Sequence, residues 1–160
     1  MARPKHRAVP GGTYFVTTNT WEQRALFVKS RWAEVVEAKL FEYRDKSEYF
    51  VHRHVIMPDH IHVILTPGSS TTLERSAQLI KGGSSHEIGV KFGTKFPVWQ
   101  PGFSQHLIRD QADYDSHVRY IDMNAVKRGL ASRPEEYAFA SATGKYRLDN
   151  WPVASGAKAP

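Results

Sequence analysis

The sequence predicts one α+β domain built on a four-stranded antiparallel sheet. Four segments are short and rich in β-branched and aromatic residues, which is typical of strands. Three other segments repeat apolar residues at helical spacing. Their order along the chain is strand, helix, strand, strand, helix, strand, with one further helix. That order is typical of the ferredoxin-like split βαβ arrangement, in which two helices cover one face of the sheet.

The strands are expected where apolar runs end at turn residues. Pro58 and Asp59 predict a tight turn, so the segments on either side of them should form an antiparallel hairpin. In the segment after this turn, Ile61, Val63 and Leu65 share one face and are expected to meet the two covering helices. The four strands are predicted at residues 12–20, 49–57, 60–66 and 103–109.

Each helix is predicted from its apolar spacing and its end residues. Ser30 is a candidate N-cap for the first helix, and Thr71 or Thr72 for the second. A Gly-Gly-Ser-Ser run is expected to interrupt or end the second helix, and Gly129 to close the third. The predicted ranges are 30–46, 71–81 and 113–129, with a loop at 88–102.

Length and composition indicate an ordinary globular protein. The 160 residues are 41% hydrophobic and 24% charged, and they contain no cysteine, which excludes a disulfide framework. Apolar runs are too short to cross a membrane, and the basic first ten residues lack the apolar stretch of a secretory signal. We expect a cytoplasmic protein with one domain at residues 1–142 and a partly disordered tail at 143–160.

The net charge points to an acidic partner. Lys and Arg number 22 against 16 Asp and Glu, which gives a formal charge of +6. A small basic domain is often built to bind nucleic acid, although a merely soluble surface would give the same count. The basic residues are spread along the chain, so a folded surface is expected to gather them.

Two histidines on the third predicted strand form a candidate metal site. His60 and His62 point to the same face, about 6–7 Å apart along the strand. Two imidazoles in this arrangement can bind one ion. A second His-X-His pair at His52 and His54 has the same spacing, so spacing alone does not choose between a metal site and a structural role. Asp59 could ligate the ion, orient His60 or only form the turn.

The last helix carries a second candidate set. One stripe, expected to face the sheet, holds Tyr114, Val118, Ile121 and Ala125. The neighbouring stripe holds His117, Tyr120, Asn124 and Lys127. A tyrosine in such a stripe is more often a packed aromatic residue than a nucleophile. Its hydroxyl can nevertheless attack a phosphodiester, and a metal held by imidazoles and an amide oxygen would polarise the phosphate.

Three motifs together resemble a known family. The segments "VIMPDHIHVIL", "VWQPGFSQHLIRD" and "HVRYIDMNAVKRGL" are similar to those of the HUH-class single-tyrosine transposases, and most of all to the REP-associated tyrosine transposases. The similarity runs from about residue 12 to residue 142. It implies a single-strand DNA endonuclease and strand-transferase on a ferredoxin-like fold, acting on DNA with hairpin or repeat elements.

The resemblance also implies roles for individual residues. His60 and His62 match the paired histidines that bind a divalent ion, and Asn124 matches the polar residue that completes the site. Tyr120 matches the nucleophile, which stays attached to the 5′ end and leaves a free 3′ hydroxyl. We expect Mg²⁺ or Mn²⁺ as the cofactor, since imidazole ligands suit Mn²⁺ and Mg²⁺ is abundant.

Several residues are candidate DNA contacts. Trp99 could stack on an unpaired base, or equally seal its loop against the sheet. His117 could move a proton, contact a phosphate or be a surface residue. The protein could act as a monomer or a homodimer. The candidate DNA-binding residues are Arg7, Lys81, Trp99, Arg109, His117, Lys127 and Arg128.

Two other functions use the same features. A repeat-DNA-binding module without cleavage would need only the fold and the charge. A metal-dependent hydrolase would use the histidine pair with water, and it would form no covalent bond to Tyr120.

Overall fold

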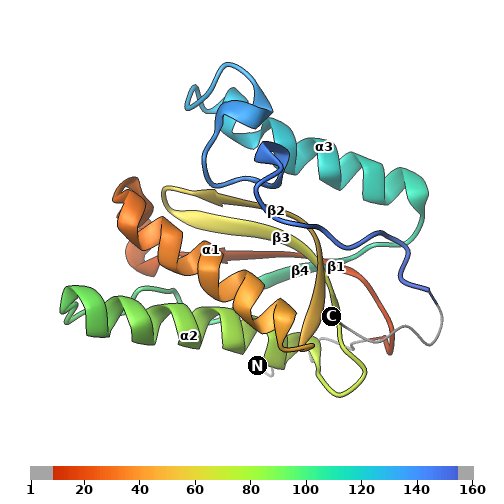
Figure 1. Cartoon of the computed structure of the whole chain (residues 1–160), viewed down its shortest axis with the longest axis horizontal. Helices are drawn as coiled ribbons and strands as arrows, with labels where there is room; N and C mark the ends of the chain where they lie inside the picture. The colour runs from red at the N-terminus through yellow and green to blue at the C-terminus, as the bar shows by residue number, and fades with distance from the viewer. Residues whose placement is uncertain (1–8, 155–160) are drawn as a thin grey trace, which may run out of the picture.

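The computed structural model of the chain describes residues 9–154 (Figure 1). Four antiparallel strands form one sheet in the order β2-β3-β1-β4. This order and the three helices confirm the predicted α+β, ferredoxin-like class. In the described part of the chain, no helix is both long and apolar enough to span a membrane. The strands are β1 (Tyr14–Asn19), β2 (Tyr49–Met57), β3 (His60–Pro67) and β4 (Ser104–Leu107).

The helices lie on both faces of the sheet. Helices α1 (Ser30–Asp45) and α2 (Leu73–Phe92) cover one face, and α3 (Gln111–Lys127) crosses the other (Figure 1). The main hydrophobic core lies between the sheet and α1 and α2. It includes Ile61, Val63 and Leu65, as the strand alternation predicted.

Helix α2 is longer than predicted. Thr72 caps it by accepting a hydrogen bond from the Arg75 amide at 3.0 Å, but the helix continues through Gly82 and Gly83 to Phe92. The expected interruption at the Gly-Gly-Ser-Ser run, and part of the expected loop at 88–102, were therefore wrong. The reason is tertiary: a Cβ at Gly83 would lie 2.3 Å from the Tyr43 hydroxyl of α1, so glycine permits the close approach of the two helices.

Helix α3 is held on the opposite face by a smaller core and an ion pair. Met57 and Ile64 from the sheet pack in one cluster with Ile121 and Ala125 of the helix. Arg53 on β2 donates two hydrogen bonds of 2.8 Å to the Asp122 carboxylate. The helix ends before Gly129, whose φ of 72° closes it as expected. These contacts fix which side of α3 faces the sheet.

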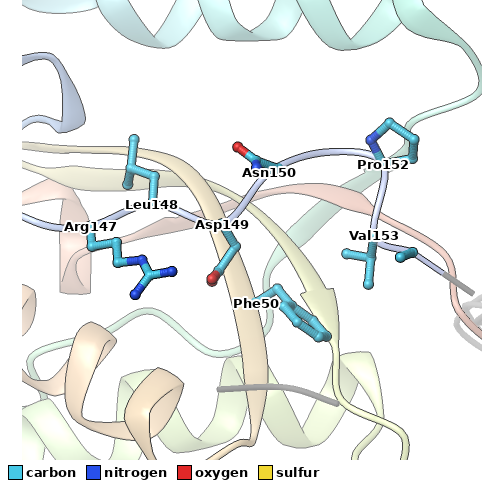
Figure 2. Close-up of a pocket in the computed structure, with 8 residues that line it drawn as sticks. Phe50, Arg147, Leu148, Asp149, Asn150, Pro152 and Val153 are labelled. Carbon is cyan, nitrogen blue, oxygen red and sulfur yellow. The ribbon is translucent and has the colours of Figure 1, made fainter. Parts of the chain in front are cut away.

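The segment after α3 returns to cover the outer edge of β2. The Ile56 amide donates to Phe139 O at 2.8 Å. Farther along, the Asp149 carboxylate accepts from the Arg44 side chain at 2.6 and 3.0 Å and from the Val51 amide at 2.9 Å. Figure 2 shows this crossing, where Asp149 and Phe50 line a shallow pocket that contains no predicted site residue. The edge of the sheet is thus paired.

The described part of the predicted tail is packed on the domain. Tyr146 and Leu148 contact the main core, and the Trp151 ring stacks on Tyr114 of α3 with a centroid distance of 4.4 Å. The Trp151 indole also donates to Thr13 Oγ1 at 3.0 Å. Residues 143–154 thus have packing contacts with the domain, and the remainder of the predicted tail lies outside the described residues.

Candidate active site

His60 and His62 lie on the face of β3 that α3 covers. Both are buried, with His62 5% exposed, and their ring centroids are 4.6 Å apart. The hairpin of β2 and β3 places them there because the alternation that sends Ile61 and Val63 into the main core sends the imidazoles to the other side. The predicted pair thus faces the predicted catalytic helix.

Hydrogen bonds orient both rings through the same nitrogen. His60 Nδ1 lies 2.6 Å from Asp59 Oδ1, and His62 Nδ1 lies 2.7 Å from Thr17 Oγ1 of β1. Nε2 is therefore the nitrogen of each ring that these two hydrogen bonds leave unused. Among the buried side-chain nitrogen and oxygen atoms of residues 9–154, only His62 Nε2 has no hydrogen-bond partner. A buried polar atom without a partner reduces the stability of the folded state, so its presence calls for an explanation such as a functional role.

Burial keeps both imidazoles neutral at physiological pH. Desolvation lowers the pKa of His62 to about 3, with smaller contributions from nearby His60 and Arg128. Desolvation also lowers the pKa of His60, although hydrogen bonding to Asp59 opposes the shift. Neutral imidazoles can ligate a metal without first losing a proton.

Helix α3 places Tyr120 beside this pair and carries Asn124 one turn later. Asn124 is buried, at 7% exposure, whereas Tyr120 one turn earlier is 47% exposed. The Tyr120 ring lies 5.3 Å from the His62 ring, centroid to centroid, with an interplanar angle of 69°. One chain therefore brings the tyrosine beside the histidine pair and leaves its side chain accessible to a substrate.

Phe15 of β1 supports this arrangement, and sequence reasoning did not identify it. Its ring stacks on His62 at 5.1 Å and meets the edge of Tyr120 at 5.9 Å. Thr17, two residues later, was also missed. The signal for both is that β1 pairs with β3 so that Thr17 lies opposite His62, a register that no single segment reveals.

The second His-X-His pair has internal partners. A bulge between Val51 and Arg53 breaks the alternation of β2, so His52 and His54 meet different surroundings. His52 bonds to Asp149 O and Thr66 Oγ1, both at 2.8 Å. His54 bonds to Glu37 Oε2 at 2.9 Å and to Ser141 Oγ at 2.7 Å. Both pairs of ring nitrogens are satisfied, which indicates a structural role.

The chemistry of the predicted donor set, His60, His62 and Asn124, is compatible with a divalent ion. Two neutral imidazoles and an amide oxygen are ligands that Mn²⁺ accepts, and Mg²⁺ accepts the oxygen more readily than the nitrogens. The partner-free His62 Nε2 is the observation from this structure that supports the fit. With an ion bound, Asp59 and Thr17 would hold the two imidazoles in orientation.

Two of the candidate DNA contacts are engaged inside the protein. Trp99 is only 6% exposed and its indole donates to Ser84 Oγ at 2.9 Å, which favours sealing over base stacking. Lys81 donates to the carbonyl oxygens of Gln100 and Gly102 at 2.7 and 2.6 Å, and burial lowers its pKa. Both side chains hold the loop before β4.

The other candidates lie along α3 and its ends. Arg109, Lys127 and Arg128 are exposed, and Arg128 Nη1 lies 3.7 Å from Asp59 Oδ1, beside the histidine pair. His117 is partly buried, and its Nδ1 lies 2.8 Å from Asp113 O. Arg7 lies outside the described residues. Arg128 is therefore the candidate contact that the structure places beside the candidate site.

A family model matches most of the chain. The model described as "Transposase IS200 like" aligns with residues 11–124, which include His60, His62, Tyr120 and Asn124. This match agrees with the resemblance drawn from the three sequence motifs.

Individual relatives agree with the family match. A REP-associated tyrosine transposase of Escherichia coli (strain K12) is 29% identical over 155 residues, covering 93% of this chain and 90% of the relative. A second curated relative, from Haemophilus influenzae, is 25% identical over 154 residues, covering 88% of this chain and 85% of the relative.

A solved structure supports the same assignment. It is described as a REP-associated tyrosine transposase bound to a REP hairpin, and it matches with a TM-score of 0.74 and 26% identity, covering 93% of this chain and 90% of its own. Motifs, fold and family model agree: the chain belongs to the IS200-like transposase family.

Proposed function

We propose that the protein cleaves and rejoins single-stranded DNA that carries hairpin or repeat elements, using Tyr120 as the nucleophile and a divalent ion at His60, His62 and Asn124. The observation that carries this proposal is the pairing of the partner-free His62 Nε2 with an accessible tyrosine ring 5.3 Å from the His62 ring. Neither feature is needed for a fold of this kind to be stable.

In the proposed reaction, the Tyr120 hydroxyl attacks the scissile phosphate. The phenol loses its proton as the oxygen–phosphorus bond forms, and the bond from phosphorus to the 3′ oxygen breaks. The 5′ end remains on the tyrosine, and the released 3′ oxygen takes up a proton. A later attack by a DNA 3′ hydroxyl reverses these steps and rejoins a strand.

The remaining residues position the reacting groups. Bound Mg²⁺ or Mn²⁺ would withdraw charge from the phosphate oxygens. Asn124 and the two histidines would hold the ion, while Asp59 and Thr17 orient the imidazoles. The Phe15 ring packs against the Tyr120 ring and would limit the directions from which the Tyr120 hydroxyl can approach the phosphate. Because one chain contains all of these residues, a monomer has a complete site.

A DNA hairpin is the proposed substrate form. The E. coli relative is named for its association with REP elements, and the matched structure is described as bound to a REP hairpin. This chain carries a formal charge of +6, and Lys127 and Arg128 are exposed at the end of the catalytic helix. Phosphate contacts of this kind predict binding that weakens steeply as salt rises.

The test is a covalent adduct on a denaturing gel. Oligonucleotide hairpins copied from the DNA flanking this gene are incubated with the protein and Mn²⁺. We expect a protein–DNA adduct with the wild type that is lost in Tyr120→Phe and in His60→Ala. Tyr114→Phe is the matched control, since Tyr114 lies on the same helix but stacks on Trp151. It should retain the adduct.

The rival functions give different patterns on the same gel. A metal-dependent hydrolase that uses water would cleave DNA in Tyr120→Phe and form no adduct. A binding module would retain tight hairpin binding in every variant with no cleavage in any. An adduct that survives Tyr120→Phe but is lost in Tyr114→Phe would show that the wrong tyrosine was assigned.

A further inference from the structure

A second group of ligating side chains lies outside the site described above. His106 on β4 and Asp113 and His117 on α3 each offer one ligand atom, and these atoms all lie within 4.8 Å of one another. Asp113 and His117 are one helical turn apart, a spacing that points both side chains the same way. The strand and the helix therefore bring three metal-ligating groups to one place.

The distances within this group are close to those across one bound ion. His106 Nε2 lies 2.8 and 3.1 Å from the two Asp113 carboxylate oxygens, and His117 Nδ1 lies 3.2 Å from Asp113 Oδ1. Ligand bonds of about 2.0–2.2 Å to a tetrahedral ion place neighbouring ligand atoms roughly 3.4 Å apart. The two histidine–Asp113 distances would therefore need to lengthen by only a few tenths of an ångström to match ligands around one ion.

Three acidic residues and one arginine lie in this part of the chain. Asp110 and Asp115 lie near Asp113 in the sequence, just before and within the first turns of α3, and Arg109 Nε lies 3.6 Å from Asp113 Oδ2. The Asp113 carboxylate lies at the centre and also accepts the Arg109 amide at 3.0 Å. Asp113 is the charged ligand of the group, and a carboxylate favours a cation.

The group is separate from the histidine pair but adjacent to it. The Phe15 ring lies between them, stacked on His62 at 5.1 Å and against His117 at 4.8 Å. The His106 and His117 rings are themselves stacked, with centroids 4.6 Å apart. An ion here would join β4 to the first turns of the helix that carries Tyr120.

We propose that His106, Asp113 and His117 form a second divalent-cation site, suited to Zn²⁺ or a similar transition-metal ion, which fastens the start of α3 to β4. A His₂Asp set matches the nitrogen and oxygen ligands that Zn²⁺ takes, with one position left for water. His117 would exchange its bond to Asp113 O for the ion. This proposal does not depend on the DNA-cleavage function.

The experiment counts bound ions in the full-length protein after removal of metal with a chelator. Zn²⁺ is titrated against a coloured chelator into the wild type, His60→Ala/His62→Ala, His106→Ala/His117→Ala and the combined variant. We expect two, one, one and no tight ions, respectively. His86→Ala, which removes an exposed histidine on α2, is the control and should bind two.

A conservative variant and a second readout keep the test independent of folding. Asp113→Asn preserves the shape of the side chain and should lower Zn²⁺ affinity by at least about tenfold in the His60→Ala/His62→Ala background. In that background, Zn²⁺ should raise the thermal midpoint, and Asp113→Asn should reduce the rise. If His60→Ala/His62→Ala binds no Zn²⁺, or if Asp113→Asn binds it as well, the second site does not exist.

Discussion

The rings of Tyr120 and His62 lie 5.3 Å apart on two elements that meet only through the packing of α3 on the sheet. Tyr120 projects from the helix and remains accessible, while His62 is buried below it with Nε2 unpaired. The position of the proposed nucleophile relative to the proposed metal ligand therefore depends on how firmly α3 is held. The contacts that hold this helix should affect chemistry as well as stability.

The Arg53–Asp122 ion pair should contribute both to the stability of the protein and to the rate of adduct formation. Asp122 lies two residues after Tyr120 and accepts two hydrogen bonds from Arg53, in a partly buried setting. Asp122→Asn should lower the free energy of unfolding by about 1 kcal/mol, because a paired charge is lost from one partner only. It should also slow adduct formation with a DNA hairpin. Urea unfolding and single-turnover adduct kinetics measure the two effects.

Asp115→Asn is the matched control for that prediction. Asp115 is on the same helix and accepts a hydrogen bond from Gln111, also within that helix. Its replacement should leave both measurements nearly unchanged. Equal losses of stability and adduct formation in Asp122→Asn and Asp115→Asn would mean that removing a negative charge from the helix is responsible, and not the loss of the Arg53–Asp122 ion pair.

Thr17→Val should weaken metal binding while preserving the fold. The variant keeps the shape of the side chain but removes the hydroxyl that holds His62 Nδ1 at 2.7 Å. Loss of such an orienting group typically lowers metal affinity about 10–100-fold. Titration with Mn²⁺, followed by the loss of the free-ion electron paramagnetic resonance signal, measures the change. Thr94→Val, in the loop after α2, should bind Mn²⁺ like the wild type; equal affinities in all three proteins would contradict the role of Thr17.

Asp149→Asn should destabilise the whole domain. Its carboxylate accepts from the Arg44 guanidinium and from the Val51 amide at the edge of β2, so it joins the last described segment to both α1 and the sheet. We expect a loss of about 2 kcal/mol in the free energy of unfolding, measured with urea. Asp45→Asn removes the other, largely exposed carboxylate near Arg44 and should cost little. A small loss in Asp149→Asn would show that the segment after residue 143 is dispensable.

Acid should destabilise the metal-free protein through its buried histidines. The folded-state pKa of His62, about 3, lies below its ordinary value of 6.5, so between these values the unfolded chain binds the additional proton. The free energy of unfolding should therefore fall as pH drops below about 6.5, by at most about 1.4 kcal/mol per pH unit for this group. The lowered pKa values of His60 and His52 add to the same trend.

Variants separate the contribution of His62 from the rest. His62→Gln should flatten the pH dependence of the free energy of unfolding, measured with urea in the presence of a chelator. His86→Gln, at an exposed position on α2, should leave the slope as it is in the wild type. If His62→Gln has the wild-type slope, the imidazole titrates normally and its site is more hydrated than the structure indicates.

Local patterns were enough to predict the fold class and to place the candidate catalytic residues of α3 on one face. The alternation after Pro58 placed Ile61 and the two histidines of β3 on opposite faces, and the turn spacing of α3 placed Tyr120 and Asn124 together. Both are consequences of backbone geometry within a single element. The family resemblance then supplied roles that the spacing alone left open, and the family match confirmed the resemblance.

Features that depend on distant segments were not accessible in this way. The Gly83–Tyr43 contact decided that α2 continues, and the bulge near Val51 decided that His52 and His54 have internal partners. The burial of Trp99 was likewise decided by packing.

The sequence by itself determined which residues share a face of β3 and of α3. Only the tertiary structure decided that Thr17 and Phe15 complete the site, that the segment at Asp149 closes the sheet and that His106 meets Asp113. The physical reason is that a strand or helix period is set by neighbouring residues along one backbone. Strand register, helix docking and contacts between ends depend instead on packing free energies summed over the whole chain.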